Sequence, residues 1–201
     1  MVEQIDEVLN FWFGPLVDGF TQSDKSDLWW GGSSEHDRLI TELFGAQVRR
    51  ALRGELDHWA DTPRGRLALI ILLDQFTRTI YRGSREAFSG DSQALRLSLE
   101  GRSSGHDRAL EFVERTFFYM PLEHAESLEI QEQCLRCFEE MLLEVPQSKR
   151  IQVENWLDFA VQHHEQIKRF GRFPHRNEVL GRSSTPEELA FLLQSHSRWG
   201  Q

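Results

Sequence analysis

Residues that start and end helices recur along this chain, and they constrain its fold more than any other feature. Thr185-Pro186-Glu187-Glu188, for example, is a capping box with proline at the first helical position, and it predicts a helix over residues 186–195. Similar signals, with apolar residues at helical spacing, predict helices over residues 2–13, 34–53, 62–81, 91–101, 107–119, 121–143 and 148–170. No alternating strand pattern competes with this interpretation. The sequence therefore predicts an all-α protein.

The length of the chain favours one domain. Its 201 residues are enough to bury a core without disulfides or metals, and no linker or low-complexity segment divides them. We expect a single helical domain over residues 1–201, built from about eight to nine helices packed as antiparallel hairpins. Residues 14–33 are predicted to be a long loop, with Trp29 and Trp30 packed beneath it.

Charge and hydropathy exclude some functions. A net charge of −9 argues against binding to nucleic acid or to an anionic membrane, since both require a basic surface. The longest apolar run, residues 67–73, is far too short to cross a membrane, and residues 1–13 lack the basic start of an export signal. Cys134 and Cys137 form a lone Cys-x-x-Cys in a helical pattern, so we interpret both as packing residues. We expect a cytoplasmic protein with no nucleic-acid or membrane partner.

The stretch RFGRFPHRN, residues 169–177, is the strongest candidate for a site. It places arginines, a histidine and an asparagine around two phenylalanines, and Pro174 prevents the preceding helix from continuing through it. The chain is rich in arginine throughout, with 20 arginines against three lysines, so only the clustering carries weight. Guanidinium groups bind carboxylates or phosphates in a bidentate way, and packing alone does not require so many of them. We predict that this stretch forms a site or its rim.

A second candidate lies at the end of the apolar run. Asp74, Arg78 and Arg82 are spaced i, i+4 and i+8, which stacks their charges along one face of a buried helix. They can form a structural ion-pair ladder, or Arg78 and Arg82 can face a cavity while Asp74 orients Arg78. The sequence leaves both interpretations open.

Glu123 and His124 form a third candidate, directly after a proline. Pro121 suits the first turn of a helix, where Glu123 and Glu126 would complement the helix dipole. Adjacent side chains on a helix point about 100° apart, so Glu123 and His124 are not expected to serve one ligand. A hydrogen-bonded, partly buried histidine is the simpler interpretation of His124.

Histidines also precede the RFGRFPHRN stretch. His163 shares a helix face with Trp156, Phe159 and Ile167, and His164 follows Val153, Leu157 and Ala160. A histidine on an apolar stripe is usually a hydrogen-bonded core residue, but two in succession do not share a face, so one of the two is expected to be exposed. His124, His163 and His175 could converge on zinc or iron with a nearby carboxylate, since imidazole and carboxylate suit both metals. No His-x-x-x-His pair supports such a site, and we predict no metal.

Three blocks of the sequence resemble the hallmark motifs of the domain-of-unknown-function 924 family. They are LLDQF at residues 72–76 with IYRG at 80–83, YMPLEH at 119–124, and RFGRFPHRN at 169–177. VLNFWFG at residues 8–14 and LGRSST at 180–185 fit the same pattern, so the resemblance spans nearly the whole chain. It implies an all-helical fold similar to tetratricopeptide-type hairpin arrays, in a bacterial cytoplasmic protein. It implies no particular reaction.

The chain departs from that family pattern at a few positions. The family usually has Gln-Phe-Pro-Arg-Asn where this chain has Thr77 and Thr79 on either side of Arg78. Since a proline would bend the helix, we expect either that other contacts hold the bend or that it is relaxed. His163 matches the family's histidine before the third block, whereas His164 stands where arginine is common.

These motifs lead to three hypotheses about function. The first is a polar pocket for a small anionic or acidic ligand, with the capacity for acid–base chemistry. Its candidates are Arg78, Arg82, Arg172 and Arg176 to hold the anion, Tyr81, Tyr119 and Asn177 to add hydrogen bonds, Asp74 and His163 to complete the lining, and Glu123, His124 and His175 to transfer protons. The second is a groove for a peptide or partner protein, anchored by Trp29, Trp30 and Trp199. In the third, the blocks form a buried polar network that only holds the helices together. The motifs point to no cofactor.

Overall fold

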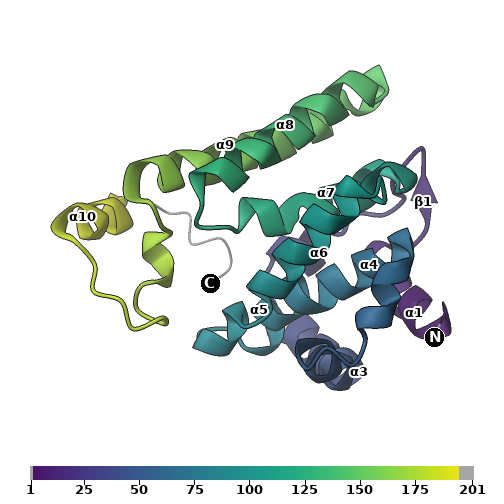
Figure 1. The fold of residues 1–201 in the computed structure, drawn as a ribbon, viewed down its shortest axis with the longest axis horizontal. Helices are drawn as coiled ribbons and strands as arrows, with labels where there is room; N and C mark the ends of the chain where they lie inside the picture. The colour runs from purple at the N-terminus through teal and green to yellow at the C-terminus, as the bar shows by residue number, and fades with distance from the viewer. Residues whose placement is uncertain (1, 195–201) are drawn as a thin grey trace. The chain divides into compact units, whose positions relative to one another are not determined.

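The computed structural model describes residues 2–194, which fold mainly into α-helices (Figure 1). These residues form two compact units, and the boundary between the units lies at Pro121 and Leu122. We describe residues 2–121 and 122–194 separately. The prediction of an all-α protein is confirmed, whereas the prediction of one domain over residues 1–201 stays a prediction.

The first unit combines a small β-hairpin with most of the helices. Its elements are α1 (Val2–Phe13), β1 (Leu16–Val17), β2 (Phe20–Thr21), α2 (Ser26–Trp30), α3 (Ser34–Leu52), α4 (Pro63–Ile70), α5 (Thr77–Ile80), α6 (Asp91–Ser103) and α7 (Phe112–Glu123). A π-helical segment, Ile71–Phe76, joins α4 to α5, and 3₁₀ turns cover Asp57–Asp61, Arg85–Phe88 and Asp107–Ala109. Helix α7 ends just beyond the boundary of the unit.

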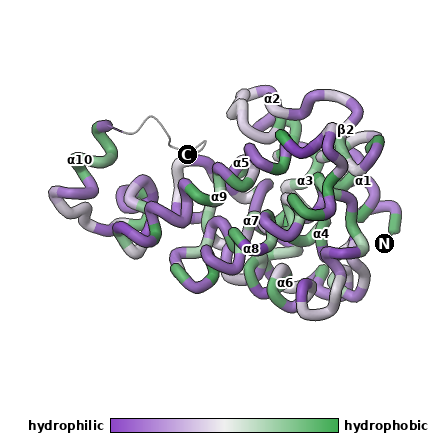
Figure 2. Tube along the Cα trace, turned by 90° about the horizontal axis from the view of Figure 1, so that it is seen from above, coloured by the Kyte–Doolittle hydropathy of each residue, from purple (hydrophilic) through white to green (hydrophobic). Residues whose placement is uncertain are grey.

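The core of the first unit surrounds the segment from Leu67 to Phe76, all of whose residues are buried. Trp12 of α1 packs edge-on against Phe76, with ring centroids 5.4 Å apart, and against Phe117 at 5.5 Å. Such edge-to-face pairs add about 0.5–1.5 kcal/mol to the stabilisation from burial itself. The alternation of hydrophobic and hydrophilic residues along the helices is visible in Figure 2. Helices α1 and α3 bury one side and expose the other, whereas residues 65–70 of α4 and 113–123 of α7 are buried throughout.

A π-helical segment interrupts the single helix that the sequence predicts over residues 62–81. Directly after this segment, the Thr77 hydroxyl donates a hydrogen bond of 2.7 Å to the Leu73 carbonyl. Gly90 approaches the same carbonyl so closely that a Cβ atom at this position would lie 2.2 Å from the oxygen. The Thr77 contact thus occurs where the family pattern has proline, and it satisfies a buried carbonyl for which proline offers no donor.

Residues 14–33 contain more regular structure than the predicted loop. The strands β1 and β2 are antiparallel, with Val17 paired to Phe20, and Asp18 and Gly19 at the turn have φ values of 52° and 80°. Two positive φ values in a two-residue turn match the twist of a hairpin, and Asp-Gly is a preferred pair for it. The loop prediction was wrong here because this hairpin is too short to show an alternating pattern.

The second unit is built on a pair of long helices. Its elements are α8 (Leu128–Glu144), α9 (Arg150–Phe170) and α10 (Pro186–Gln194), with 3₁₀ turns over Gln147–Lys149 and Pro174–Arg176. A short connection joins α8 to α9, so the two run antiparallel and pack against each other along their length (Figure 1). The predicted helix over residues 186–195 is confirmed as far as Gln194, and Ser195 lies outside the described residues.

Pro121 does not start a helix as the sequence suggested. It lies inside the last turn of α7, and the next helix begins at Leu128 after a short turn. The carbonyls at the end of α7 are satisfied from α8, where Gln131 Nε2 donates to the Glu123 carbonyl at 2.5 Å and to the Ala125 carbonyl at 2.9 Å. Glu123 therefore sits at the C-terminal end of a helix, and the expected interaction with a positive N-terminal dipole is wrong.

The helix predicted to begin at Asp107 also starts later. Asp107 lies in a 3₁₀ turn, and α7 begins at Phe112. The Glu111 N–H donates to Glu114 Oε2 at 3.0 Å, so Glu114 satisfies a free amide at the start of α7. Among residues 2–194, no helix combines the length and the apolar character needed to cross a membrane.

Candidate functional site

The RFGRFPHRN stretch begins in the last turn of α9 and forms the first part of the connection to α10. Gly171 ends α9 with a φ of 69°, and its N–H donates to the Ile167 carbonyl at 2.8 Å. This left-handed conformation favours glycine, because other residues carry a Cβ atom that strains it. Pro174 then opens a 3₁₀ turn, Pro174–Arg176. The prediction that the helix stops before Pro174 is confirmed.

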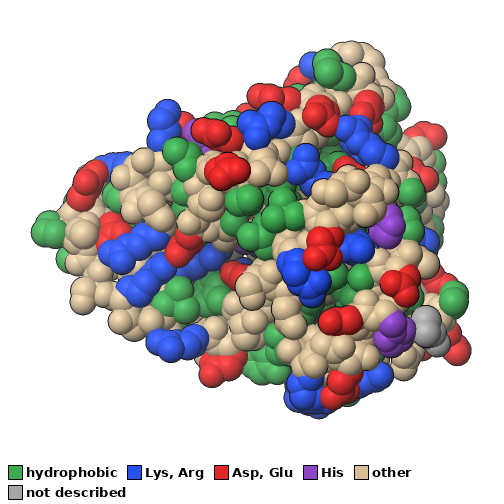
Figure 3. Space-filling view, in the orientation of Figure 1, with side chains coloured by type: hydrophobic (Ala, Val, Ile, Leu, Met, Phe, Trp, Pro, Cys, Tyr) green, Lys and Arg blue, Asp and Glu red, His purple; other side chains and the backbone are tan. Residues whose placement is uncertain are grey.

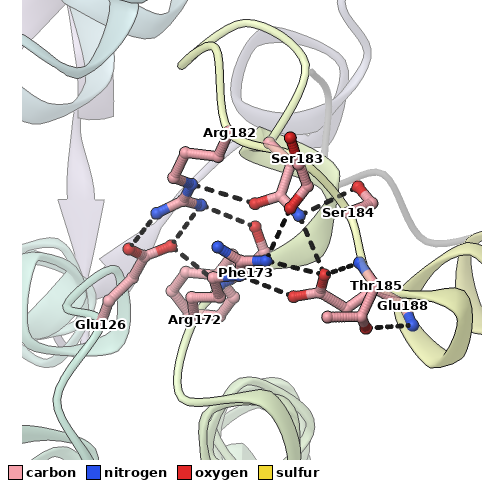
Figure 4. Close-up of polar contacts among 9 residues, drawn as sticks. Glu126, Arg172, Phe173, Arg182, Ser183, Ser184, Thr185 and Glu188 are labelled. Carbon is pink, nitrogen blue, oxygen red and sulfur yellow. Dashed lines mark hydrogen bonds and ion pairs between the residues drawn. The ribbon is translucent and has the colours of Figure 1, made fainter.

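Glu126 binds this connection from the turn between α7 and α8 (Figure 4). Its carboxylate accepts the Phe173 N–H at 2.8 Å and both terminal nitrogens of Arg182, at 2.6 and 2.9 Å. Burial by itself would raise the pKa of Glu126, but the hydrogen bonds from Arg182 and Phe173 outweigh it and the pKa is lowered. Glu126 therefore stays ionised and holds the turn as a charged acceptor.

Glu188 binds the connection from α10. Its buried carboxylate accepts Arg172 Nε at 2.7 Å and Nη2 at 2.9 Å, a bidentate pair. It also completes the predicted capping box: Glu188 accepts the Thr185 N–H at 2.7 Å, and Thr185 Oγ1 accepts the Glu188 N–H at 3.2 Å. The hydrogen bonds from Arg172, with the Thr185 amide, lower the pKa of Glu188 to about 2.

Asn177 links the two carboxylates into one network. Its Oδ1 accepts Arg182 Nε at 3.0 Å, and its Nδ2 donates to Ser184 Oγ at 3.0 Å and to Glu188 at 3.3 Å. Hydrogen bonds thus run continuously from Glu126 through Arg182 and Asn177 to Glu188. We call these residues, with Arg172, the turn network. Its arginines are bound by carboxylates of the same chain.

A buried carboxylate–imidazole pair lies beside the turn network. His163 Nδ1 of α9 is 3.0 Å from Glu123 Oε1 and 2.9 Å from the Phe159 carbonyl. The His163 and Glu123 side chains are each only 6% exposed. The structure thus makes His163 the buried, hydrogen-bonded histidine of the two, and its partner is the glutamate of the second motif block.

Aromatic rings connect this pair to two more histidines. The His163 ring lies 5.5 Å from Phe173 and 6.2 Å from His124, and Phe173 lies 5.6 Å from His175, all between centroids. The Arg176 guanidinium stacks 4.4 Å from the Phe173 centroid, and Nη1 donates to the His124 carbonyl at 3.1 Å. We call His124, His163, His175 and Arg176 around Phe173 the histidine cluster. His124 and His175 are half-buried, so the cluster extends from the interior towards solvent.

In the first unit, the candidate arginines contact carboxylates of other helices. Arg78 Nη1 lies 2.7 Å from Asp91 Oδ1, whereas Asp74 is 3.9 Å away from Arg78 Nη2. Arg82 makes a bidentate contact with Asp37 of α3, at 3.1 Å for each bond. The Asp74–Arg78 contact of 3.9 Å thus keeps the i, i+4 part of the predicted ladder, but Arg82 binds Asp37 of α3 and does not continue it.

The remaining first-unit candidates differ in burial. Asp74 is fully buried and accepts Gln75 Nε2 at 2.6 Å. The Tyr119 hydroxyl donates to Asp107 Oδ2 at 2.7 Å, and burial with this hydrogen bond raises the pKa of Tyr119. Tyr81 is half-buried. Asp74 and Tyr119 thus have hydrogen-bond partners inside the first unit.

The predicted site residues therefore divide between the units. The first unit holds Asp74, Arg78, Tyr81, Arg82 and Tyr119, and the second holds Glu123, His124, His163, Arg172, His175, Arg176 and Asn177. Within the second unit, the YMPLEH and RFGRFPHRN blocks contact each other. Sequence reasoning missed the roles of Glu126 and Arg182, whose partners cannot be read from spacing; the capping box did mark Glu188.

The other candidates take ordinary positions. In residues 2–194, no group of three His, Cys, Asp or Glu side chains is arranged to hold a metal ion. Cys134 and Cys137 are buried side chains on α8, as expected for packing residues. Trp29 Nε1 donates to the Trp12 carbonyl at 3.1 Å, and the half-exposed Trp30 stacks on Phe117. Trp199 lies outside the described residues. Figure 3 shows Lys and Arg side chains gathered on one face of the molecule, with acidic side chains among and beside them.

The fold and the turn network define an all-helical protein whose α9–α10 connection is held by paired arginines and carboxylates. The chain belongs to the family described as bacterial protein of unknown function (DUF924), whose model matches residues 8–196. Its structure is similar to that of a protein of unknown function from Agrobacterium tumefaciens, with a TM-score of 0.81 and 31% identity over 96% of this chain and 99% of that one. No curated protein matches the chain. The resemblance found in the sequence is thus confirmed.

Proposed function

We propose that the protein binds a small acidic ligand, one that carries a carboxylate or a phosphate, at the histidine cluster of the second unit. The observation that carries this proposal is the buried contact of 3.0 Å between His163 Nδ1 and Glu123 Oε1 at the inner end of the cluster. A few polar side chains that converge at one place, some of them within reach of solvent, are the usual composition of a small-molecule site.

The composition of the cluster favours an anion. Arg176 is charged at every physiological pH, and each imidazole can donate an N–H to an oxyanion. Histidine gains positive charge as the pH falls below neutrality, so the affinity for an anion is expected to increase in that direction. His124 and His175 are half-buried, which leaves them within reach of a ligand from solvent.

The turn network has a different part in this proposal. Arg172 and Arg182 are already bound by Glu188 and Glu126, at distances of 2.6 to 2.9 Å. An incoming anion would have to displace these carboxylates. We therefore assign the turn network the role of holding Phe173 and His175 in position, which lowers the entropic cost of binding at the cluster.

The same pair equips the cluster for proton transfer. A carboxylate that binds one nitrogen of an imidazole fixes the orientation of the ring. Glu123 is in this position relative to His163, and His124 and His175 are the nearby groups through which a proton could reach solvent. We propose further that these side chains carry out acid–base chemistry on the bound ligand. The low cysteine content, two in 201 residues, and the bacterial family support a cytoplasmic location for it.

A thermal-shift screen tests the proposal. We would measure the melting temperature of the wild-type protein with a panel of small carboxylates and phosphates between pH 6 and 8. His175→Gln removes one half-buried imidazole of the cluster. His164→Gln is the matched control, because His164 lies on the same helix as His163 but contacts the exposed Glu165, at 3.4 Å.

We expect at least one compound to raise the melting temperature of the wild type and of His164→Gln, and to do so more strongly at pH 6 than at pH 8. A hydrogen bond to a charged group contributes about 1.5–3 kcal/mol, so His175→Gln should bind that compound roughly tenfold or more weakly. The proposal fails if no compound stabilises the wild type, or if both variants respond as the wild type does.

A further inference from the structure

Helix α9 presents three faces of different chemistry. The buried face carries Val153, Ala160 and Ile167 and packs against α8. At about 100° per residue, the charged side chains gather on a second face. They are Arg150, Glu154, Asp158, Glu165, Lys168 and Arg169. The third face carries Gln152, Asn155, Phe159 and Gln162, which follow each other at intervals of three and four residues. We call these four residues the amide stripe.

The amide stripe is exposed although it carries no charge. All four residues are exposed, and the Phe159 side chain at its centre is 50% exposed. In the described part of the chain, Gln152, Asn155 and Gln162 make no hydrogen bond or ion pair through their side chains. A solvent face of a helix usually carries charges, whereas exposed aromatic groups without charged neighbours are typical of the centre of a protein interface.

The spacing of the stripe fits a second copy of the same helix. Asn155 and Gln162 lie four residues before and three residues after Phe159, so a two-fold axis at Phe159 places each of them beside the other in an antiparallel pair. An amide side chain both donates and accepts hydrogen bonds, which makes such contacts self-complementary. We propose that the protein self-associates through this stripe, with the α9 helices of two copies antiparallel and Phe159 on the two-fold axis.

Charge also favours this face over the others. The chain has a net charge of −9, so most surfaces of one copy repel the same surfaces of another. A two-fold axis brings each residue near its own copy, and only an uncharged stripe avoids like-charge contacts there. The stripe ends towards Gln166, which has the next position in the pattern but is buried. From Gln152 to Gln162 it is therefore roughly 15 Å long, which predicts a weak dimer in the micromolar range.

Cysteine cross-linking tests the two-fold axis directly. A cysteine on the two-fold axis lies opposite the same cysteine of the second copy, so Phe159→Cys should form a disulfide-linked dimer on mild oxidation. Asp158→Cys is the matched control, because this adjacent residue is exposed on the charged face. Both variants retain the buried Cys134 and Cys137, which makes any background from these thiols equal. We expect dimer formation at least tenfold faster for Phe159→Cys.

Sedimentation velocity on the wild type and Phe159→Asp provides a readout without oxidation. We expect a concentration-dependent sedimentation coefficient for the wild type at tens to hundreds of micromolar, and a dissociation constant raised roughly tenfold or more by Phe159→Asp, as for a central interface residue. A wild type that stays monomeric at these concentrations would overturn the proposal and favour an extended peptide as the occupant. Equal cross-linking rates for the two cysteine variants would overturn it as well. Neither outcome depends on ligand binding at the histidine cluster.

Discussion

Replacing Glu188 with glutamine should destabilise the second unit in a way that depends on pH. The carboxylate accepts hydrogen bonds from Arg172, Asn177 and the Thr185 amide, and its side chain is 3% exposed. Glutamine keeps one acceptor oxygen, but its NH₂ group is a donor that would face the donors of Arg172 or Thr185. The substitution therefore removes the ion pair while it leaves the size of the side chain almost unchanged.

The lowered pKa of Glu188 sets the magnitude. A decrease from 4.5 to about 2 corresponds to roughly 3 kcal/mol of preference for the ionised form in the folded protein. The Arg172 side chain is 28% exposed, so solvent screens part of this interaction. We expect Glu188→Gln to lower the free energy of unfolding by about 1–2 kcal/mol at pH 7.

The sign of the pH dependence follows from the same values. The pKa of the folded state lies below that of the unfolded chain, so the carboxylate stabilises the fold fully above about pH 5. This stabilisation decreases as the pH falls from 4.5 towards 2, and about half or more of it should be lost by pH 3. Urea denaturation of the wild type and Glu188→Gln between pH 3 and 7 measures the difference directly.

Glu187→Gln is the control for this measurement. Glu187 is the preceding residue of α10 and pairs with Arg169 at 2.8 Å, but both side chains are more than half exposed. Exposed pairs contribute about 0–1 kcal/mol, so this variant should differ little from the wild type. The reasoning is refuted if Glu188→Gln is as stable as Glu187→Gln at pH 7, or if its difference from the wild type stays constant down to pH 3.

Three more substitutions test other parts of the second unit by urea denaturation. Glu126→Ala should lower the free energy of unfolding by about 2 kcal/mol, because Arg182 loses its carboxylate partner. It should also speed hydrogen exchange in residues 171–185, and unchanged exchange in these residues would contradict the prediction. Gly171→Ala should lower the free energy of unfolding by about 1 kcal/mol. The loss comes from backbone strain alone, since no atom lies within 4 Å of the new Cβ, and a neutral effect would argue against the left-handed conformation. Gln131→Leu should lower the free energy of unfolding by about 1–3 kcal/mol, because the carbonyls at the end of α7 lose their hydrogen-bond donor. A stabilised variant would disprove this role of Gln131.

The helix limits show how far local signals reach. The capping box at Thr185 and Glu188 identified the start of α10, and Gly54 and Gly171 follow the ends of α3 and α9, because these signals act within a few residues. Pro121 was misleading, because proline suits a first helical turn, whereas here it lies in the last turn of α7. The carbonyls at the end of that helix are bound by Gln131 of α8, a contact that no local signal near Pro121 indicates.

The candidate site shows the same limit more strongly. The sequence marked His163, Glu123 and His175 as residues of interest, and the structure brings all three into one region of the second unit. It did not indicate that Glu126 would be the partner of Arg182, which lies 56 positions further along the chain. A guanidinium group can bind any carboxylate within reach, so its residue type alone does not select the partner.

The sequence by itself thus determined the all-α class, most of the helices and the family, because caps, glycine ends and apolar spacing are properties of neighbouring residues. Only the tertiary structure decided which charges meet. Glu123 became the partner of a histidine 40 positions away, and Arg172 became the partner of Glu188 across the α9–α10 connection. The physical reason is that ion pairs and hydrogen bonds act over about 3 Å, and helix packing decides which distant residues come that close.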